Sequence, residues 1–280
     1  MSPDNVDQTV ELAPEGEVER INLTFRIQHI IMLTSFLLLF FTGWALKFHE
    51  VEGSHRWIQL WGGPKVAGIV HRTAGITMLI DSLFHLCYLG YRASRGKLRW
   101  DLIPDWQDIR DLCQNFRYFL GLSPDKPRFR RFSYLQKFDY WAVFWGIFII
   151  GISGLALTLP TKAALLFPAW TSNWIWELIY IMHSDEALLA IVFILFWHFY
   201  NEHLRPDVFP MNWIWLTGKM SVEELQERHP REFERLFPGA KATAAATVAG
   251  PVVAAAEAEG IAAPDAAPET TAPEGDASDR

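Results

Sequence analysis

Four long apolar stretches constrain this sequence more than any other feature. They cover about residues 30–48, 66–91, 139–159 and 174–200, and each is long enough to cross a bilayer as a helix, which takes about 20 residues. Backbone groups in lipid must be hydrogen-bonded within the segment, and the alternating pattern of a membrane barrel is absent. The sequence therefore predicts an all-α fold, a transmembrane bundle of four helices within residues 20–218.

Polar segments flank this bundle. Residues 1–19 carry six acidic side chains and no basic one, and residues 239–280 carry seven acidic against two basic. The two ends thus hold −11, so that the net charge of −7 leaves +4 on residues 20–238. We expect an acidic tail over 1–19, a short helical segment over 219–238, and a disordered tail rich in Ala, Pro and Glu over 239–280.

Basic residues are concentrated in one connection. Eleven Lys and Arg lie between residues 92 and 137, whereas the first connection has Arg56 and Lys65 and the third only Lys162. The positive-inside rule places this connection and both termini in the cytoplasm, which predicts a multi-pass protein of the bacterial inner membrane. Within the connection, residues 104–122 have apolar side chains at helical spacing, so we expect an amphipathic helix at the inner membrane surface.

Several classes of function are disfavoured. The two cysteines form no C-x-x-C or C-x-x-C-H motif, which disfavours a disulfide framework, a zinc ribbon and covalent haem attachment. No nucleophile motif, metalloprotease motif or phosphate loop occurs, so we predict no catalytic residue. No nucleic-acid partner is expected.

Histidines are the candidate functional groups. Five of the nine lie at membrane depth, where an ionisable side chain is costly: His29, His71, His85, His183 and His198. His71 and His85 are 14 residues apart, so on a helix they point within about 40° of each other and lie about 21 Å apart along the axis. His183 and His198 are 15 residues apart, which gives an angle of about 60° and a separation of about 22 Å. Two levels of facing histidines suit a planar cofactor held on both faces, and imidazole is a standard axial ligand of haem iron.

The inner level holds more histidines than one cofactor needs. His29 shares it with His85 and His198, so that one of the three is spare or two inner sites exist. His203 points about 140° away from His198, which leaves a third haem, a quinone contact or solvation open. We expect the remaining histidines at the surface: His49, His55 and His229.

Local motifs in residues 20–218 resemble those of a known family. FRIQH ending at His29, HRTAG from His71, YLQKFDYWAVFWGIFIIGISGLAL, and HSDEALLAIVFILFWH with His183 and His198 occur in chain order. Together they are similar to the integral membrane cytochrome b subunits of formate dehydrogenases and nickel-iron hydrogenases, diheme proteins that exchange electrons with quinone. The sequence departs from that pattern at Ile30, where the family often has an aromatic residue.

The resemblance implies two haem b groups. His71 and His183 would hold the outer one, and His29 and His198 the inner one. His85 does not belong to this pattern, because a histidine pair 14 apart on the second helix is similar instead to quinol-oxidising cytochromes b, in which His85 would pair with His198. We favour His29 and keep His85 as an alternative inner ligand or a quinone contact.

We therefore expect electrons to pass between a periplasmic redox subunit and quinone, in a respiratory oxidoreductase complex. HFYNEHLRPDVFP also resembles cytochrome b subunits that work with periplasmic multihaem c-type cytochromes. Arg72 is a candidate partner of a haem propionate, and Gln136 and Lys137 are candidate polar groups near the quinone. A metal or proton transporter, or a membrane anchor without haem, is the alternative; transport folds typically have broken helices or paired repeats, and no repeat occurs beyond the histidine spacing.

Overall fold

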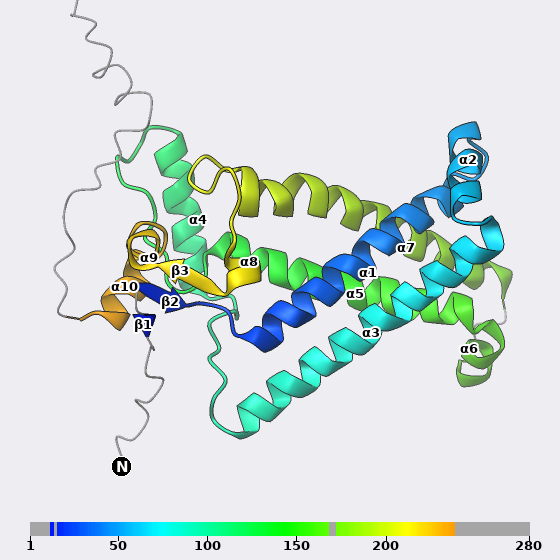
Figure 1. Ribbon diagram of the computed structural model, residues 1–280, viewed down its shortest axis with the longest axis horizontal. Helices are drawn as coiled ribbons and strands as arrows, with labels where there is room; N and C mark the ends of the chain where they lie inside the picture. The colour runs from blue at the N-terminus through cyan, green and yellow to red at the C-terminus, as the bar shows by residue number, and fades with distance from the viewer. Residues whose placement is uncertain (1–11, 14–15, 168–171, 239–280) are drawn as a thin grey trace, which may run out of the picture. The chain divides into compact units, whose positions relative to one another are not determined.

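The four predicted spans are long helices. The computed structural model describes residues 12–13, 16–167 and 172–238 (Figure 1). The helices that are long and apolar enough to cross a membrane are α1 (Leu23–Lys47), α3 (Pro64–Ser94), α5 (Tyr134–Thr158) and α7 (Asn173–Val192), which continues through π-helical turns η2 (Phe193–His198) and η3 (Tyr200–Leu204). The prediction of an all-α transmembrane bundle is confirmed. The predicted disordered tail, 239–280, and most of the acidic tail lie outside the described residues.

Local capping explains where the long helices begin. The side chain of Asn22 accepts a hydrogen bond from the backbone N–H of Phe25 (3.1 Å), which starts α1 before the predicted span. Pro64 occupies the first turn of α3, where its missing N–H costs nothing. Ser133 and Gln136 form a capping box at the start of α5, each side chain accepting from the backbone N–H of the other residue.

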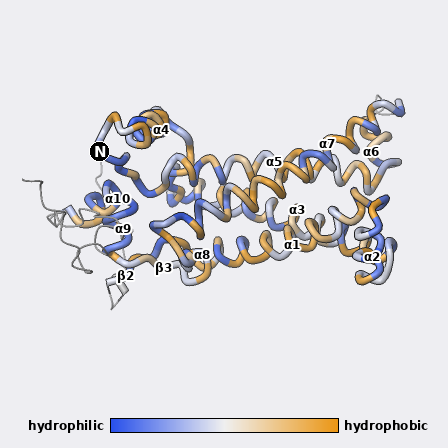
Figure 2. The backbone as a smooth tube through the Cα atoms, turned by 90° about the horizontal axis from the view of Figure 1, so that it is seen from above, coloured by the Kyte–Doolittle hydropathy of each residue, from blue (hydrophilic) through white to orange (hydrophobic). Residues whose placement is uncertain are grey.

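The bundle is closed by four helix pairs. α1 packs against α3, α5 against α7, α3 against α5, and α1 against α7. Gly151 marks the approach of α5 to α3, since a Cβ atom there would lie 2.5 Å from Leu79 Cδ2. Most apolar side chains of the spans face outward, and Figure 2 shows hydrophobic residues along the length of the long helices. Such a surface suits lipid.

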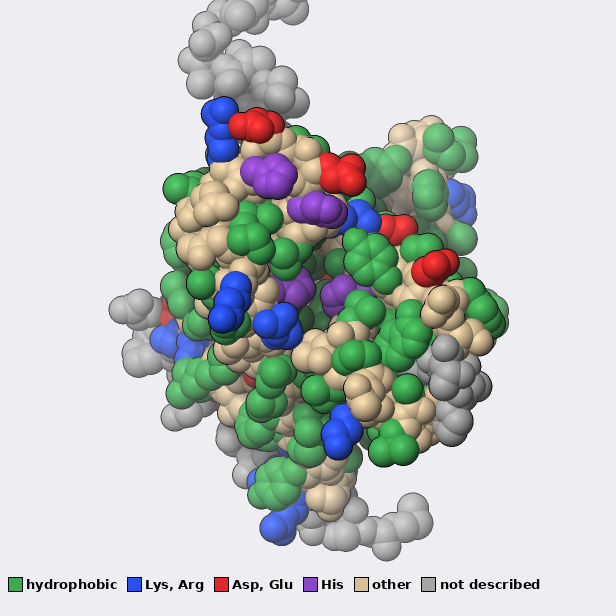
Figure 3. All heavy atoms as spheres, turned by 90° about the vertical axis from the view of Figure 1, so that its right-hand side faces the viewer, with side chains coloured by type: hydrophobic (Ala, Val, Ile, Leu, Met, Phe, Trp, Pro, Cys, Tyr) green, Lys and Arg blue, Asp and Glu red, His purple; other side chains and the backbone are tan. Residues whose placement is uncertain are grey.

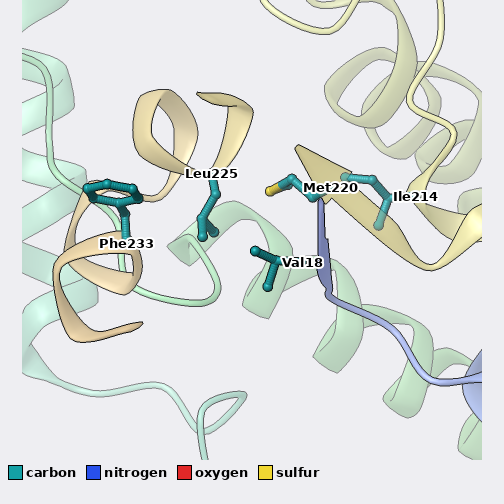
Figure 4. Packing of buried hydrophobic residues seen from close by; sticks show 5 residues of the cluster. All are labelled: Val18, Ile214, Met220, Leu225 and Phe233. Atoms are coloured by element: carbon teal, nitrogen blue, oxygen red, sulfur yellow. The ribbon is translucent and has the colours of Figure 1, made fainter. Parts of the chain in front are cut away.

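One end of the bundle carries the basic 92–137 connection and is called here the basic end. It contains a small added unit. Strands β1 (Leu12–Ala13), β2 (Glu17–Glu19) and β3 (Lys219–Ser221) form an antiparallel sheet in that order. With α8 (Ile214–Thr217), α9 (Val222–Arg228) and α10 (Pro230–Leu236), it encloses the cluster shown in Figure 4: Val18, Ile214, Met220, Leu225 and Phe233. The chain before α1 is thereby tied to the segment that follows α7.

Helix α4 (Trp106–Phe119) lies at the same end and runs across the direction of the long helices (Figure 1). Its apolar residues are exposed, among them Trp106, Phe116 and Phe119. Its polar face is fastened to α5, because Lys137 Nζ lies 2.8 Å from Asp108 Oδ2. The opposite end of the bundle carries the short helices α2 (Glu52–Leu60) and α6 (Pro160–Leu166).

His229 corrects one expectation about the basic end. It was expected at the surface, yet only 3% of it is exposed, and its Nδ1 lies 2.7 Å from the carbonyl oxygen of Arg130. Burial, and next the charge of Arg20, lower the pKa of His229 to about 3. The neighbouring Glu232 is equally buried and pairs with Arg235 at 2.8 Å. His229 is therefore a neutral core residue of this unit.

Candidate functional site

The structure brings the predicted outer pair of histidines together. His71 lies on α3 and His183 on α7, helices that are far apart in sequence. Their ring centres are 6.3 Å apart, and the ring planes make an angle of 79°. Figure 3 looks onto the opposite end of the bundle and shows histidine side chains both on the surface and deeper, where this face is hollowed between the helices.

Hydrogen bonds fix which nitrogen of His71 is free. Thr42 Oγ1 lies 2.5 Å from the carbonyl oxygen of Leu38 and 2.9 Å from His71 Nδ1. A hydroxyl group has one proton, and a carbonyl can only accept, so Thr42 donates to Leu38 and accepts from His71 Nδ1–H. A neutral imidazole protonated at Nδ1 has its lone pair on Nε2. In the described part of the chain, His71 Nε2 has no hydrogen-bond partner.

His183 is held in the same tautomer by a different helix. Its Nδ1 lies 3.0 Å from the carbonyl oxygen of Ile150 on α5, which can only accept, and 3.3 Å from Ser153 Oγ. The hydroxyl of Ser153 donates to the carbonyl oxygen of Ile149 at 2.8 Å. The proton of His183 is therefore on Nδ1, and its Nε2 carries a lone pair with no partner among the described residues. Ligating histidines are typically oriented by a hydrogen bond of this kind at the other ring nitrogen.

The spacing of these two rings fits one metal ion between them. In a five-membered ring with bonds of about 1.35 Å, each atom lies about 1.15 Å from the centre, and a metal–imidazole bond is about 2 Å long. Two imidazoles on opposite sides of one ion then have ring centres about 6.3 Å apart. The observed separation is 6.3 Å. The separation of the ring centres is thus compatible with one shared metal ion, and each ring has an Nε2 without a partner among the described residues.

Glycines let neighbouring helices press against both rings. A Cβ atom at Gly43 of α1 would lie 3.1 Å from His71 Cε1, and one at Gly154 of α5 would lie 2.7 Å from His183 Cε1. Sequence reasoning missed Thr42 and Gly43, because nothing in a local pattern shows which residues of α1 face α3. Gly68, one turn before His71 on the same helix, faces the side chain of Arg72.

The inner level contains a second group of histidines near the basic end. His198 Nδ1 lies 3.1 Å from Asp139 Oδ2, and this carboxylate is 7% exposed. His29 packs against Trp215 with ring centres 5.6 Å apart, and its Nδ1 is buried with no hydrogen-bond partner among residues 12–13, 16–167 and 172–238. His29 is close enough to His198 and His203 to interact with both electrostatically. His203 Nδ1 is also buried without a hydrogen-bond partner among the described residues, which argues against solvation of this atom and leaves the other two alternatives open.

His85 differs from the other four membrane histidines. Its Nδ1 lies 2.7 Å from Gln28 Oε1, and its Nε2 lies 3.1 Å from the hydroxyl of Tyr140. Both ring nitrogens therefore have partners within the protein. Among the described residues, His71, His183 and His198 each have a partner at one ring nitrogen only.

The remaining candidate residues are placed as follows. The amide of Gln136 is part of the capping box of α5, and Lys137, 4% exposed, bonds Asp108 and the carbonyl oxygen of Ile103 (3.2 Å). Gln136 therefore caps α5, and Lys137 fastens the connection to that helix. Arg72 has no hydrogen bond or ion pair in the part of the chain that the structure describes, and it is close enough to His71 to act on it electrostatically.

Comparison with known proteins identifies the family of the chain. Residues 20–201 match the family described as prokaryotic cytochrome b561, which is more than half of the 280 residues and includes all five membrane histidines. No curated protein matches the chain. The resemblance stated from the motifs is confirmed. The chain belongs to the prokaryotic cytochrome b561 family, and it is a multi-pass membrane cytochrome of the b type, a haem b protein of electron transfer.

Proposed function

We propose that this cytochrome carries electrons across the inner membrane through two haems, each held by two histidines, between a periplasmic redox subunit and quinone. The observation that carries the proposal is the pair His71–His183, with ring centres 6.3 Å apart and both Nε2 lone pairs free. Bound haem supplies an iron that gains and loses single electrons. The protein supplies ligands, orientation and electrostatics.

His71 and His183 are the proposed ligands of the outer haem. Thr42 and the carbonyl group of Ile150 hold the two rings from opposite helices, so that neither ring needs to reorganise when it binds. A preorganised ligand pair binds more tightly because this ordering is already complete. Arg72, which has no partner within the described residues, is the proposed counter-charge for a propionate at this level.

His29 and His198 are the proposed ligands of the inner haem. Asp139 orients His198 and increases the basicity of its ring through the hydrogen bond at Nδ1. The buried nitrogen of His29 has no partner, whereas both nitrogens of His85 are bonded to Gln28 and Tyr140. These contacts support His29 over His85 as the second ligand.

The orientation follows from charge. The basic end carries the lysines and arginines of the 92–137 connection, which the positive-inside rule assigns to the cytoplasm. The opposite end, with α2 and α6, then faces the periplasm and is the proposed docking face for a redox subunit or a multihaem cytochrome c. The inner haem would lie near the cytoplasmic surface, together with the quinone.

Separate substitution of each histidine tests the ligand assignment. The variants His71→Ala, His183→Ala, His29→Ala and His198→Ala are each expected to lose about one of two haems per chain, and His85→Ala to keep both. Haem is counted as its pyridine complex, and the reduced-minus-oxidised b bands show which haem is lost. A colourless wild-type protein would refute the whole proposal. A loss of haem in His85→Ala with none in His29→Ala would exchange the two inner ligands.

A further inference from the structure

Three polar side chains meet between α1, α3 and α5 at a position that the proposed haem ligands do not occupy. Gln28, His85 and Tyr140 come from the three helices and are joined by hydrogen bonds of 2.7 and 3.1 Å through the imidazole. We propose that this cluster binds the head group of a membrane quinone or quinol. The inference deepens the function proposed above, because it rests on quinone being the partner and names its site.

Gln28 indicates that the cluster lacks a ligand. The residue is 6% exposed, and its Nε2 is buried without a hydrogen-bond partner in the part of the chain that the structure describes. Reversing the side-chain amide does not help, because one of its two polar atoms must face His85 Nδ1 and the other is then unpaired. A buried polar atom without a partner costs about 1–3 kcal/mol. A ligand oxygen or hydroxyl group at this amide would remove that cost.

The cluster presents a donor and an acceptor whichever way its protons are arranged. If Gln28 Oε1 accepts from His85 Nδ1–H, then His85 Nε2 accepts from Tyr140, which leaves the Gln28 N–H groups as donors and the Tyr140 oxygen as an acceptor. If the amide is reversed, each bond reverses, so that Gln28 offers an acceptor and Tyr140 a donor. The hydroxyl groups of a quinol both donate and accept, so they match either arrangement, whereas the carbonyl groups of a quinone accept only from the group that donates.

The surroundings select a lipid-soluble aromatic ligand. All three residues lie in membrane-spanning helices, where a polar group without a partner is costly and water is scarce. The ring centre of Phe25 lies 5.7 Å from that of His85 and 5.4 Å from that of Tyr88. His85 and Tyr140 are only partly buried, so part of each side chain is accessible from outside the protein. A quinone ring combines this solubility with hydrogen-bonding oxygens.

The test compares variants of the haem-loaded protein in detergent. Tyr140→Phe removes one hydroxyl group, and Gln28→Leu and His85→Leu remove the other two polar groups. Ser82→Ala is the matched control, because Ser82 lies on the same helix as His85 and its hydroxyl bonds only the Met78 carbonyl of that helix (2.8 Å). The measurements are haem content, equilibrium binding of radiolabelled decylubiquinone, the rate of haem reduction by duroquinol, and the particle mass.

We expect Tyr140→Phe and Gln28→Leu to keep both haems and the wild-type mass, and to bind decylubiquinone about three- to tenfold more weakly, as for the loss of one hydrogen bond. Ser82→Ala should bind as the wild type does. Unchanged binding in all three site variants would overturn the site alone, and so would loss of a haem in His85→Leu. A change in particle mass without a change in quinone binding would assign the cluster to contact between copies of the chain. A wild-type protein that holds two haems but binds no quinone would overturn the quinone part of the proposed function.

Discussion

Substitution of Gly154 by alanine tests the geometry of the outer histidine pair with one methyl group. The added Cβ atom would lie 2.7 Å from His183 Cε1 and 3.1 Å from its Nδ1. Carbon atoms in contact are normally about 3.5–4.0 Å apart. The imidazole or the backbone of α5 must therefore move by about 1 Å. Because the same ring is bonded to the Ile150 carbonyl oxygen of α5 at 3.0 Å, it cannot move without lengthening that bond.

The expected cost follows from two contributions. Forcing an extra methyl group into a packed position typically costs about 1–3 kcal/mol, and losing a neutral hydrogen bond adds about 0.5–1.5 kcal/mol. The sum, about 2–4 kcal/mol, corresponds to a loss of about thirtyfold to a thousandfold in the affinity of the outer site for its haem. The gain in helix propensity from Gly to Ala, at most about 1 kcal/mol, stabilises the haem-free and the haem-bound protein alike and so does not offset this loss of affinity.

Gly146→Ala is the matched control. Gly146 lies on the same helix, and a Cβ atom there would meet nothing within 4 Å. Both variants are purified with limiting haem, and the haem per chain and the potential of each b band are measured. We expect Gly154→Ala to lose the outer haem or to shift its potential, and Gly146→Ala to match the wild type. Equal haem content and equal potentials in both variants would refute the assignment of His183 as a closely packed ligand.

Three further outcomes are expected. Asp139→Asn removes the negative charge that faces His198, so the midpoint potential of the inner haem should rise in a redox titration, and an unchanged potential would contradict this role. Lys137→Met leaves the Asp108 carboxylate without its cation, which costs about 3–5 kcal/mol. Proteolysis of the 92–137 connection should therefore be faster than in the wild type, while both b bands persist. Resistance to protease equal to that of the wild type would argue against the contact. The depressed pKa of His229 means that the unfolded chain binds the extra proton first, so stability of the basic end should fall as the pH drops from about 6.5 to 3, by about 2 kcal/mol at pH 5. Hydrogen exchange in α9 and α10 measures this fall, which His229→Gln should abolish.

The membrane topology was predictable from local properties of the chain. A run of about 20 apolar residues can satisfy its backbone in lipid only as a helix, so the four spans follow from composition alone. Helices α1 and α5 begin at Leu23 and Tyr134, earlier than the predicted starts near residues 30 and 139. Capping by Asn22 and Ser133 extends both helices beyond the apolar run. The β2–β3 pairing was not predicted, since three-residue strands carry no pattern.

The histidines show where sequence reasoning stops. Periodicity placed His71 and His183 at one level, and the helix pairs brought their rings together. From the sequence, His85 and His29 were both candidate ligands of the inner haem. Only the structure shows that Gln28 and Tyr140 are bonded to the two ring nitrogens of His85.

By itself, then, the sequence determined the spans, the family and the residues able to ligate iron, because hydropathy, motif and residue type are properties of one segment at a time. The tertiary structure alone decided which imidazoles keep a free lone pair and which polar groups are already engaged. Lys137 shows the same division: it resembled a site residue in its motif, but it fastens α4 to α5 through Asp108. The tautomer and orientation of each imidazole depend on hydrogen-bond partners from other helices. No local sequence pattern specifies which face of a neighbouring helix will lie against a given histidine.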